Sequence, residues 1–129
     1  AVSTGEIDVG FVNHYYLFRF LAEEGDSFPA RNYHPRNGGP GATVMVAGAG
    51  VLASSGNQEV AQRFLGFMLS TVGQQYFAGQ TFEYPLVEGV NTPKVLTPLS
   101  GFTHPDIPIK DLGDPKGTQD LLRRAGVTP

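Results

Sequence analysis

Cysteine is absent from the 129-residue sequence. Without it the chain cannot carry a disulfide framework, a thiolate zinc site, an iron–sulfur cluster or a cysteine nucleophile. The absence does not decide the cellular compartment, because proteins without cysteine occur in reducing and in oxidising compartments alike.

An excess of positive charge is also lacking. Nine Lys and Arg residues stand against twelve Asp and Glu, the formal net charge is -3, and no basic run occurs anywhere in the chain. The electrostatic pattern of a nucleic-acid binder is therefore missing, and we expect no nucleic-acid partner. The mild negative charge suits a cationic ligand but is too small to identify one.

Long hydrophobic runs are missing as well. The most apolar stretches, Val44–Ala53 and Phe64–Leu69, are well below the roughly 18 residues that span a bilayer. The first residues, AVSTGEIDVGF, include neither an initiating methionine nor the basic and apolar regions of a signal peptide. We expect a processed or excised piece of a longer protein.

The residues that are present predict one folded domain with long connections. Hydrophobic residues make up 40% of the chain, while 17 glycines and 10 prolines point to many loops without the composition of a disordered protein. The β-branched and apolar segments Ile7–Val12 and Ala42–Ala53 predict strands. With the helices described next, they predict an α/β fold.

Four helices are predicted from periodicity and caps. A largely buried helix over Tyr15–Glu24 follows Asn13 as N-cap and ends at Gly25. Apolar residues recur at three- and four-residue steps over Gln58–Leu69, and a second helix runs from a Ser-Thr cap to Ala78. A last helix begins at Asp114 or Thr118 and ends at Gly126.

Motifs for catalysis are weak, so we expect no enzyme. GAGVLA, residues 48–53, resembles a dinucleotide fingerprint, but Ser54 to Asn57 interrupt at once the helix that the fingerprint must open. No G-x-S-x-G elbow is present, and the adjacent Ser54 and Ser55 have no nearby base.

The most unusual constellation is Asn13-His14-Tyr15-Tyr16, at the end of a predicted strand and the opening of a helix, where α/β proteins present ligand-binding groups. A hard trivalent cation displaces a phenol proton that otherwise leaves near pH 10, and it gains a charged oxygen ligand. Packing at a rim or in the core remains an alternative for two tyrosines. The three histidines have no metal-site spacing, and solvent-facing histidine is the simpler interpretation.

Six segments, in this order, resemble one family: the ferric-iron-binding extracytoplasmic solute-binding proteins of ABC transporters, in their C-terminal portion. The segments are Asn13-x-Tyr15-Tyr16, GGPGATVMVAGAGVLASS (38–55), AQRFLGFMLS (61–70), TVGQQYFA (71–78), Glu-Tyr-Pro-Leu (83–86) and LLRRAGV (121–127). Each motif is weak by itself, and the order and spacing carry the resemblance.

The resemblance implies part of a two-lobed periplasmic-binding-protein fold of type II-like architecture, with a short sheet and flanking helices. Residues 1–40 and 99–129 are expected in one lobe and residues 43–95 in the other. Tyr15 and Tyr16 are expected to bind Fe³⁺ as phenolates, and Asn13 to hold a synergistic anion beside it. The implied partner is an ABC transporter permease, and the implied location is periplasmic or extracytoplasmic, with or without a lipid anchor.

Family members are more than twice as long as this chain, so the remaining metal and anion ligands are expected outside it. The chain alone is then expected to bind iron weakly or not at all, and its exposed apolar edges favour a dimer or an exchanged assembly. Two alternatives stay open. One is a solute-binding protein for another small ligand, such as a polyamine, thiamine or a phosphonate; the other is a stand-alone interaction or enzymatic domain.

Overall fold

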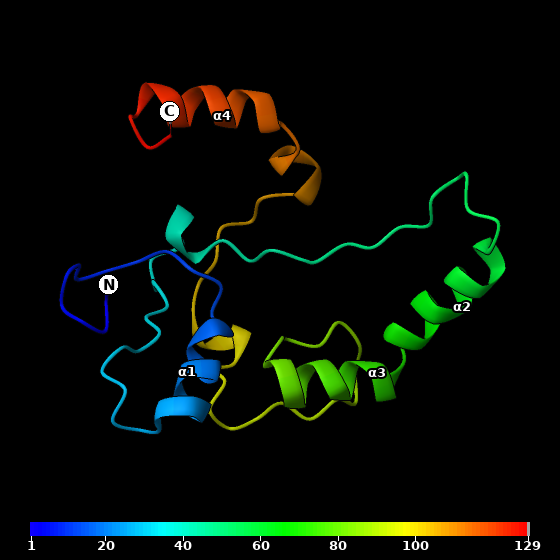
Figure 1. Ribbon diagram of the computed structural model, residues 1–129, viewed down its shortest axis with the longest axis horizontal. Coiled ribbons are helices and arrows are strands. Elements are labelled where there is room, and N and C mark those ends of the chain that lie inside the picture. Colours follow the sequence, from blue (N-terminus) through cyan, green and yellow to red (C-terminus); the bar gives the residue numbers. More distant parts are fainter. Residues whose placement is uncertain (129) are drawn as a thin grey trace. The chain divides into compact units, whose positions relative to one another are not determined.

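The computed structural model describes residues 1–128 and contains four α-helices joined by long connections (Figure 1). A π-helical turn follows the third helix, and three short 3-10 turns lie in the loops. The α-helices are α1 (Tyr16–Glu24), α2 (Gln58–Met68), α3 (Thr71–Tyr76) and α4 (Pro115–Arg124); the π-helical turn is Phe77–Thr81 and the 3-10 turns are Pro40–Ala42, Leu99–Gly101 and Ile109–Leu112.

The chain divides into two compact units. The first unit combines Ala1–His34 with Ala47–Gly101 and contains α1, α2 and α3. The second combines Pro35–Val46 with the chain from Phe102 onward and contains α4. The predicted N-terminal constellation therefore belongs to the first unit.

The predicted strands are not formed within residues 1–128. Ile7–Val12 and the stretch from Val44 to Leu52 have neither helix nor strand pairing, and the short sheet of the predicted α/β fold is not confirmed. The physical reason is that a strand exists only when its N–H and C=O groups pair with a neighbour, and these segments find none here. Their side chains stay outside, as the exposed Phe11 and Leu52 show.

Helix α1 matches its prediction in extent but not in its cap. It begins at Tyr16, and Tyr15 takes the N-cap position without a side-chain cap. The predicted cap at Asn13 is wrong, because the Asn13 amide donates to the Tyr15 hydroxyl rather than accepting a backbone N–H. Gly25 ends the helix with a φ of 76°, a region that glycine enters without strain.

The core of the first unit is small and aromatic. Within α1 only Phe18 is buried, so the prediction of a largely buried helix is wrong. The Phe18 ring stacks on Phe82, with centroids 4.4 Å apart, and Phe20 stacks on the buried Phe28 at 5.1 Å. The first contact ties α1 to the residues that follow the π-helical turn, and the second ties it to the loop that follows α1.

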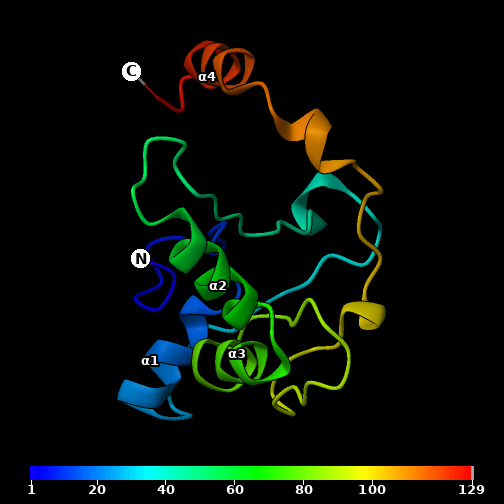
Figure 2. The ribbon, with the colours of Figure 1, turned by 90° about the vertical axis from the view of Figure 1, so that its right-hand side faces the viewer.

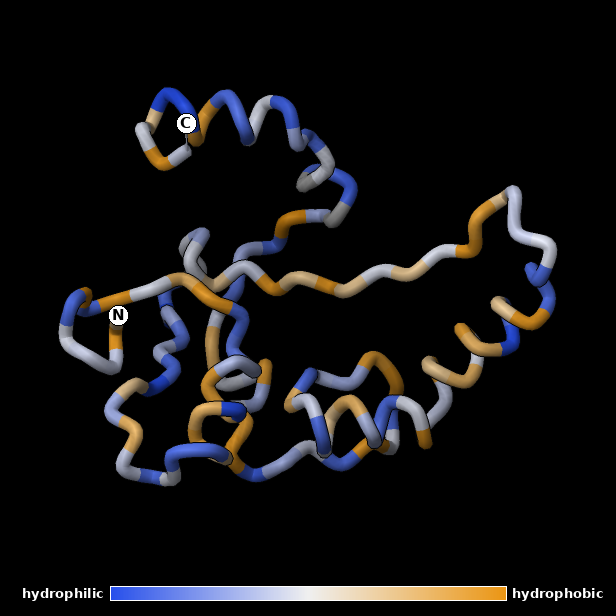
Figure 3. The backbone as a smooth tube through the Cα atoms, in the orientation of Figure 1, coloured by the Kyte–Doolittle hydropathy of each residue, from blue (hydrophilic) through white to orange (hydrophobic). Residues whose placement is uncertain are grey.

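Helices α2 and α3 confirm the periodicity and the serine cap. The Ser70 hydroxyl accepts the Gly73 N–H at the start of α3. Figure 3 shows apolar and polar positions alternating along α2. None of the α2 residues is buried, and Val60, Phe64 and Phe67 are all more than half exposed. Much of the apolar face of α2 is thus exposed.

Two consecutive glutamines fasten the following loop to α3, beside which it runs in Figure 2. The buried Gln74 donates to the Met68 carbonyl at 2.9 Å and accepts the Leu86 N–H at 2.8 Å. Gln75 exchanges two hydrogen bonds with the Asn91 backbone, at 2.9 and 3.0 Å. This double attachment holds both ends of the 86–91 loop.

Gly73 stands where the junction between α2 and α3 leaves no room for a side chain. A Cβ there would lie 2.5 Å from the Phe67 carbonyl oxygen and 2.9 Å from that of Met68. Because both neighbours are backbone atoms, we expect Gly73→Ala to lower the free energy of unfolding by about 1–3 kcal/mol in urea denaturation.

Gly66 in α2 supplies the matched control, because nothing lies within 4 Å of its Cβ position. Gly66→Ala should be neutral or stabilising, since alanine has the higher helix propensity. Equal destabilisation by the two substitutions would contradict the close approach at Gly73.

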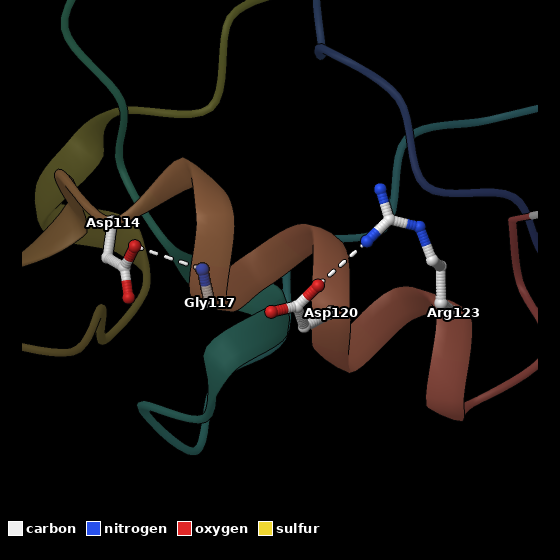
Figure 4. Close-up of polar contacts among 4 residues, drawn as sticks. All are labelled: Asp114, Gly117, Asp120 and Arg123. Atoms are coloured by element: carbon white, nitrogen blue, oxygen red, sulfur yellow. Dashed lines mark hydrogen bonds and ion pairs between the residues drawn. The ribbon is translucent and has the colours of Figure 1, made fainter.

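Helix α4 confirms the predicted C-terminal helix. The Asp114 carboxylate accepts the Gly117 N–H at 2.9 Å (Figure 4), and Pro115 takes the first helical position. Asp120 and Arg123 form an exposed ion pair at 2.7 Å one turn later. Both features are local, which explains why the sequence predicts this helix well.

Candidate metal-binding site

The tyrosine pair lies at the opening of α1. The chain turns into the helix here, with the Tyr16 N–H donating to the Asn13 carbonyl at 3.2 Å. The Tyr15 and Tyr16 rings are neighbours, with centroids 4.9 Å apart and planes inclined by 48°. Tyr15 is half-buried, whereas 43% of Tyr16 is exposed. The two phenols are thus close together and reachable from solvent.

Asn13 contacts the first of these phenols directly. Its amide nitrogen donates to the Tyr15 hydroxyl oxygen at 2.9 Å. The contact fixes the Tyr15 hydroxyl beside the Asn13 amide.

His14 connects the turn with a remote segment. Its Nε2 lies 2.7 Å from the Phe82 carbonyl oxygen, and because a carbonyl only accepts, Nε2 carries the proton. The His14 ring lies edge-on to Tyr15 at 5.5 Å and against Tyr84 at 4.9 Å. The backbone carbonyl of His14 accepts the Asn32 amide at 2.8 Å.

His34 lies close enough to His14 for a charge on His14 to change the pKa of His34. Burial lowers the pKa of His34, and a positive charge on His14 lowers it further. The two causes both favour a neutral His34 imidazole at neutral pH.

Tyr84 is the neighbour that sequence reasoning missed. Its hydroxyl donates to the Thr97 carbonyl, and burial raises the pKa of Tyr84. Both effects favour the protonated form of Tyr84. Tyr84 is part of the Glu-Tyr-Pro-Leu motif, but nothing in the sequence predicts that it lies beside His14.

The sequence-predicted residues Asn13, Tyr15 and Tyr16 thus come together in one turn. His104 lies in the other unit, where its Nδ1 is 3.4 Å from the adjacent Pro105 carbonyl oxygen. Within residues 1–128, no three His, Asp or Glu side chains gather as a metal-binding group. The donors that the site offers are phenol oxygens, which suit a hard cation once their protons leave.

Comparison with known proteins shows that the sequence is similar to those of ferric-iron-binding proteins. The chain is 34% identical over 128 residues to the major ferric iron-binding protein of Neisseria meningitidis serogroup B and 33% identical over 129 residues to the Fe(3+)-binding periplasmic protein of Serratia marcescens. Each match covers 98% of this chain, but only 39% and 38% of the relative. Iron uptake protein A1 of Synechocystis is 33% identical over 118 residues.

The chain therefore spans about two fifths of the length of the relatives it matches. The resemblance to ferric-iron-binding extracytoplasmic proteins is confirmed, and the names of these relatives describe binding and uptake rather than catalysis. No protein-family profile matches the chain. Among the helices of residues 1–128, none has both the length and the apolar character that crossing a membrane requires.

Proposed function

We propose that this chain is the C-terminal portion of the substrate-binding component of an ABC-type iron(III) importer. Two kinds of support agree. Relatives named for ferric iron binding match 98% of the chain, and the two phenols that the motif pattern marks lie side by side at the opening of α1. The single observation that carries the proposal is the 4.9 Å contact between the Tyr15 and Tyr16 rings.

Ferric iron is the cargo in this proposal. Tyr15 and Tyr16 bind it as phenolates, which supply negative charge and hard oxygen together. Asn13 has a second amide hydrogen beside the one donated to Tyr15, and it holds the synergistic anion. Tyr84 stays protonated and shapes the wall of the site instead.

The rest of the parent protein completes the fold and the coordination sphere. Residues 1–40 and 99–129 belong to one lobe and residues 43–95 to the other, so that the lobes close on the ion. Ile7–Val12 and Ala42–Ala53 become strands when the remaining polypeptide supplies neighbours for their free backbone groups. The apolar face of α2 is covered in the same way.

The parent protein works outside the cytoplasm and delivers iron to the permease of the transporter. One relative is named as a periplasmic protein, which supports this location. A dimer or an exchanged assembly of the isolated chain stays a prediction, and sedimentation at high concentration tests it.

Metal analysis of the full-length protein tests the function. We expect about one Fe³⁺ per protein after loading with ferric citrate and dialysis, together with a visible phenolate-to-iron absorption band. A protein that instead retains an organic amine, thiamine or a phosphonate, and no iron, would support the alternative solute-binding function.

The 129-residue chain alone should bind iron far more weakly than the full-length protein. Two phenolates fill only part of an octahedral coordination sphere, and water or buffer must occupy the other positions. A titration with ferric citrate should therefore give little of the visible band. A stoichiometric colour that resists excess citrate would show that the chain holds a complete site.

A further inference from the structure

His14 occupies a central place among the aromatic residues of the site, although the proposed function gives it no role. The centroid of its ring lies 5.5 Å from that of Tyr15 and 4.9 Å from that of Tyr84. Its Nε2–H and its backbone carbonyl bond to two other parts of the chain, at Phe82 and Asn32. One residue thus joins three segments of the first unit.

The partner of the His14 ring is itself held in place. Phe82 has a φ of 58°, a left-handed conformation that a bulky residue keeps only where its surroundings enforce it. Its ring stacks on the buried Phe18 of α1, and the Glu83 N–H bonds to the Phe77 carbonyl at 3.2 Å. The Phe82 carbonyl is therefore a fixed anchor point for His14.

Tyr15 is in direct contact with the His14 ring, which the Phe82 carbonyl holds in place. The Asn13 amide bonds to its hydroxyl, and the His14 ring, which also contacts Tyr84, lies edge-on to it. Tyr16 is more exposed, and its ring contacts that of Tyr15. A change in the position of Tyr15 therefore also affects the ring of Tyr16.

We propose that His14 is a positioning residue, which holds the Tyr15 phenol ready for the metal through its contacts with Phe82 and Tyr84. The inference rests on the proposed iron-binding function. Nε2 is occupied by the Phe82 carbonyl, so His14 acts through Tyr15 and does not use this nitrogen as a ligand. Holding the phenols in one arrangement removes part of the entropic cost of binding.

The test compares His14→Ala with His14→Gln in the full-length protein loaded with ferric citrate. Replacement of a group that orients a metal ligand costs about 10–100-fold in metal affinity, and we expect a loss of this size for His14→Ala. The phenolate-to-iron band should also shift, because the Tyr15 oxygen meets the ion in a changed geometry. His14→Gln places an amide N–H near the position of Nε2 and should restore much of the affinity.

Two controls separate positioning from general destabilisation. Gln74→Ala removes buried hydrogen bonds away from the phenols, so it should lower the unfolding temperature without moving the band. His104→Ala removes an exposed histidine of the other unit and should change neither quantity.

The outcomes are distinguishable. An unchanged band and affinity in His14→Ala, in a protein whose wild type shows the band, would overturn the role of His14 alone. A band shift in Gln74→Ala equal to that in His14→Ala would also overturn it. A wild-type protein without any phenolate-to-iron band would overturn the proposed function, and the inference with it.

Discussion

Replacing both Tyr15 and Tyr16 by phenylalanine is expected to abolish tight ferric iron binding by the full-length protein. The substitution keeps both rings, and with them the 4.9 Å ring contact, but removes the oxygens that we propose as metal ligands. Altering a group that merely supports a metal ligand already costs about 10–100-fold, so loss of either ligand should weaken binding by at least about 100-fold. The visible band should disappear in the double variant.

Competition with citrate measures this loss, since each variant is titrated against the same chelator. Tyr33→Phe is the matched control, because Tyr33 is 83% exposed and lies outside the turn that carries the pair. Its band and affinity should equal those of the wild type. Retention of tight, coloured iron binding in the double variant would remove the two phenols from the site.

Helices were predictable from the sequence because their signals are local. The apolar period of α2, the Ser70 cap of α3 and the Asp114 cap of α4 all lie within a few residues of the structure that they specify. The strands depend on partners instead. Ile7–Val12 has the β-branched composition of a strand, but composition does not supply the neighbour whose backbone must pair with it.

The candidate site also combines local features, which the sequence predicts, with contacts between distant residues, which it does not. Tyr15 and Tyr16 are adjacent in sequence, so their proximity at a helix start could be foreseen. The bond from His14 to Phe82 joins positions 68 residues apart, and it depends on the left-handed turn after the π-helical segment. Asn13 has two possible hydrogen-bonding roles, and its N-cap propensity does not decide between them. Its amide donates to the Tyr15 hydroxyl instead of its side chain capping the helix.

Proton release should report the number of phenols that bind the metal. A phenol ordinarily keeps its proton up to a pH of about 10, so each phenolate ligand formed near neutral pH releases one proton. The apparent affinity then rises with pH, by about tenfold per pH unit for each phenol that loses a proton on binding. With two phenols, the apparent affinity rises about a hundredfold per pH unit. In a variant with only one of the two tyrosines it should rise about tenfold per pH unit.

The comparison between wild type and Tyr16→Phe isolates the phenol, because the protonation of the competing chelator is the same in both titrations. A pH range of about 7–8 lies above the ordinary titration of imidazole, near 6.5, and the lowered pKa of His34 keeps that residue neutral there. Tyr84 adds nothing, since its raised pKa and its bond to the Thr97 carbonyl retain the proton. Equal pH slopes for the two proteins would mean that the Tyr16 oxygen keeps its proton and that the metal is bound by other groups.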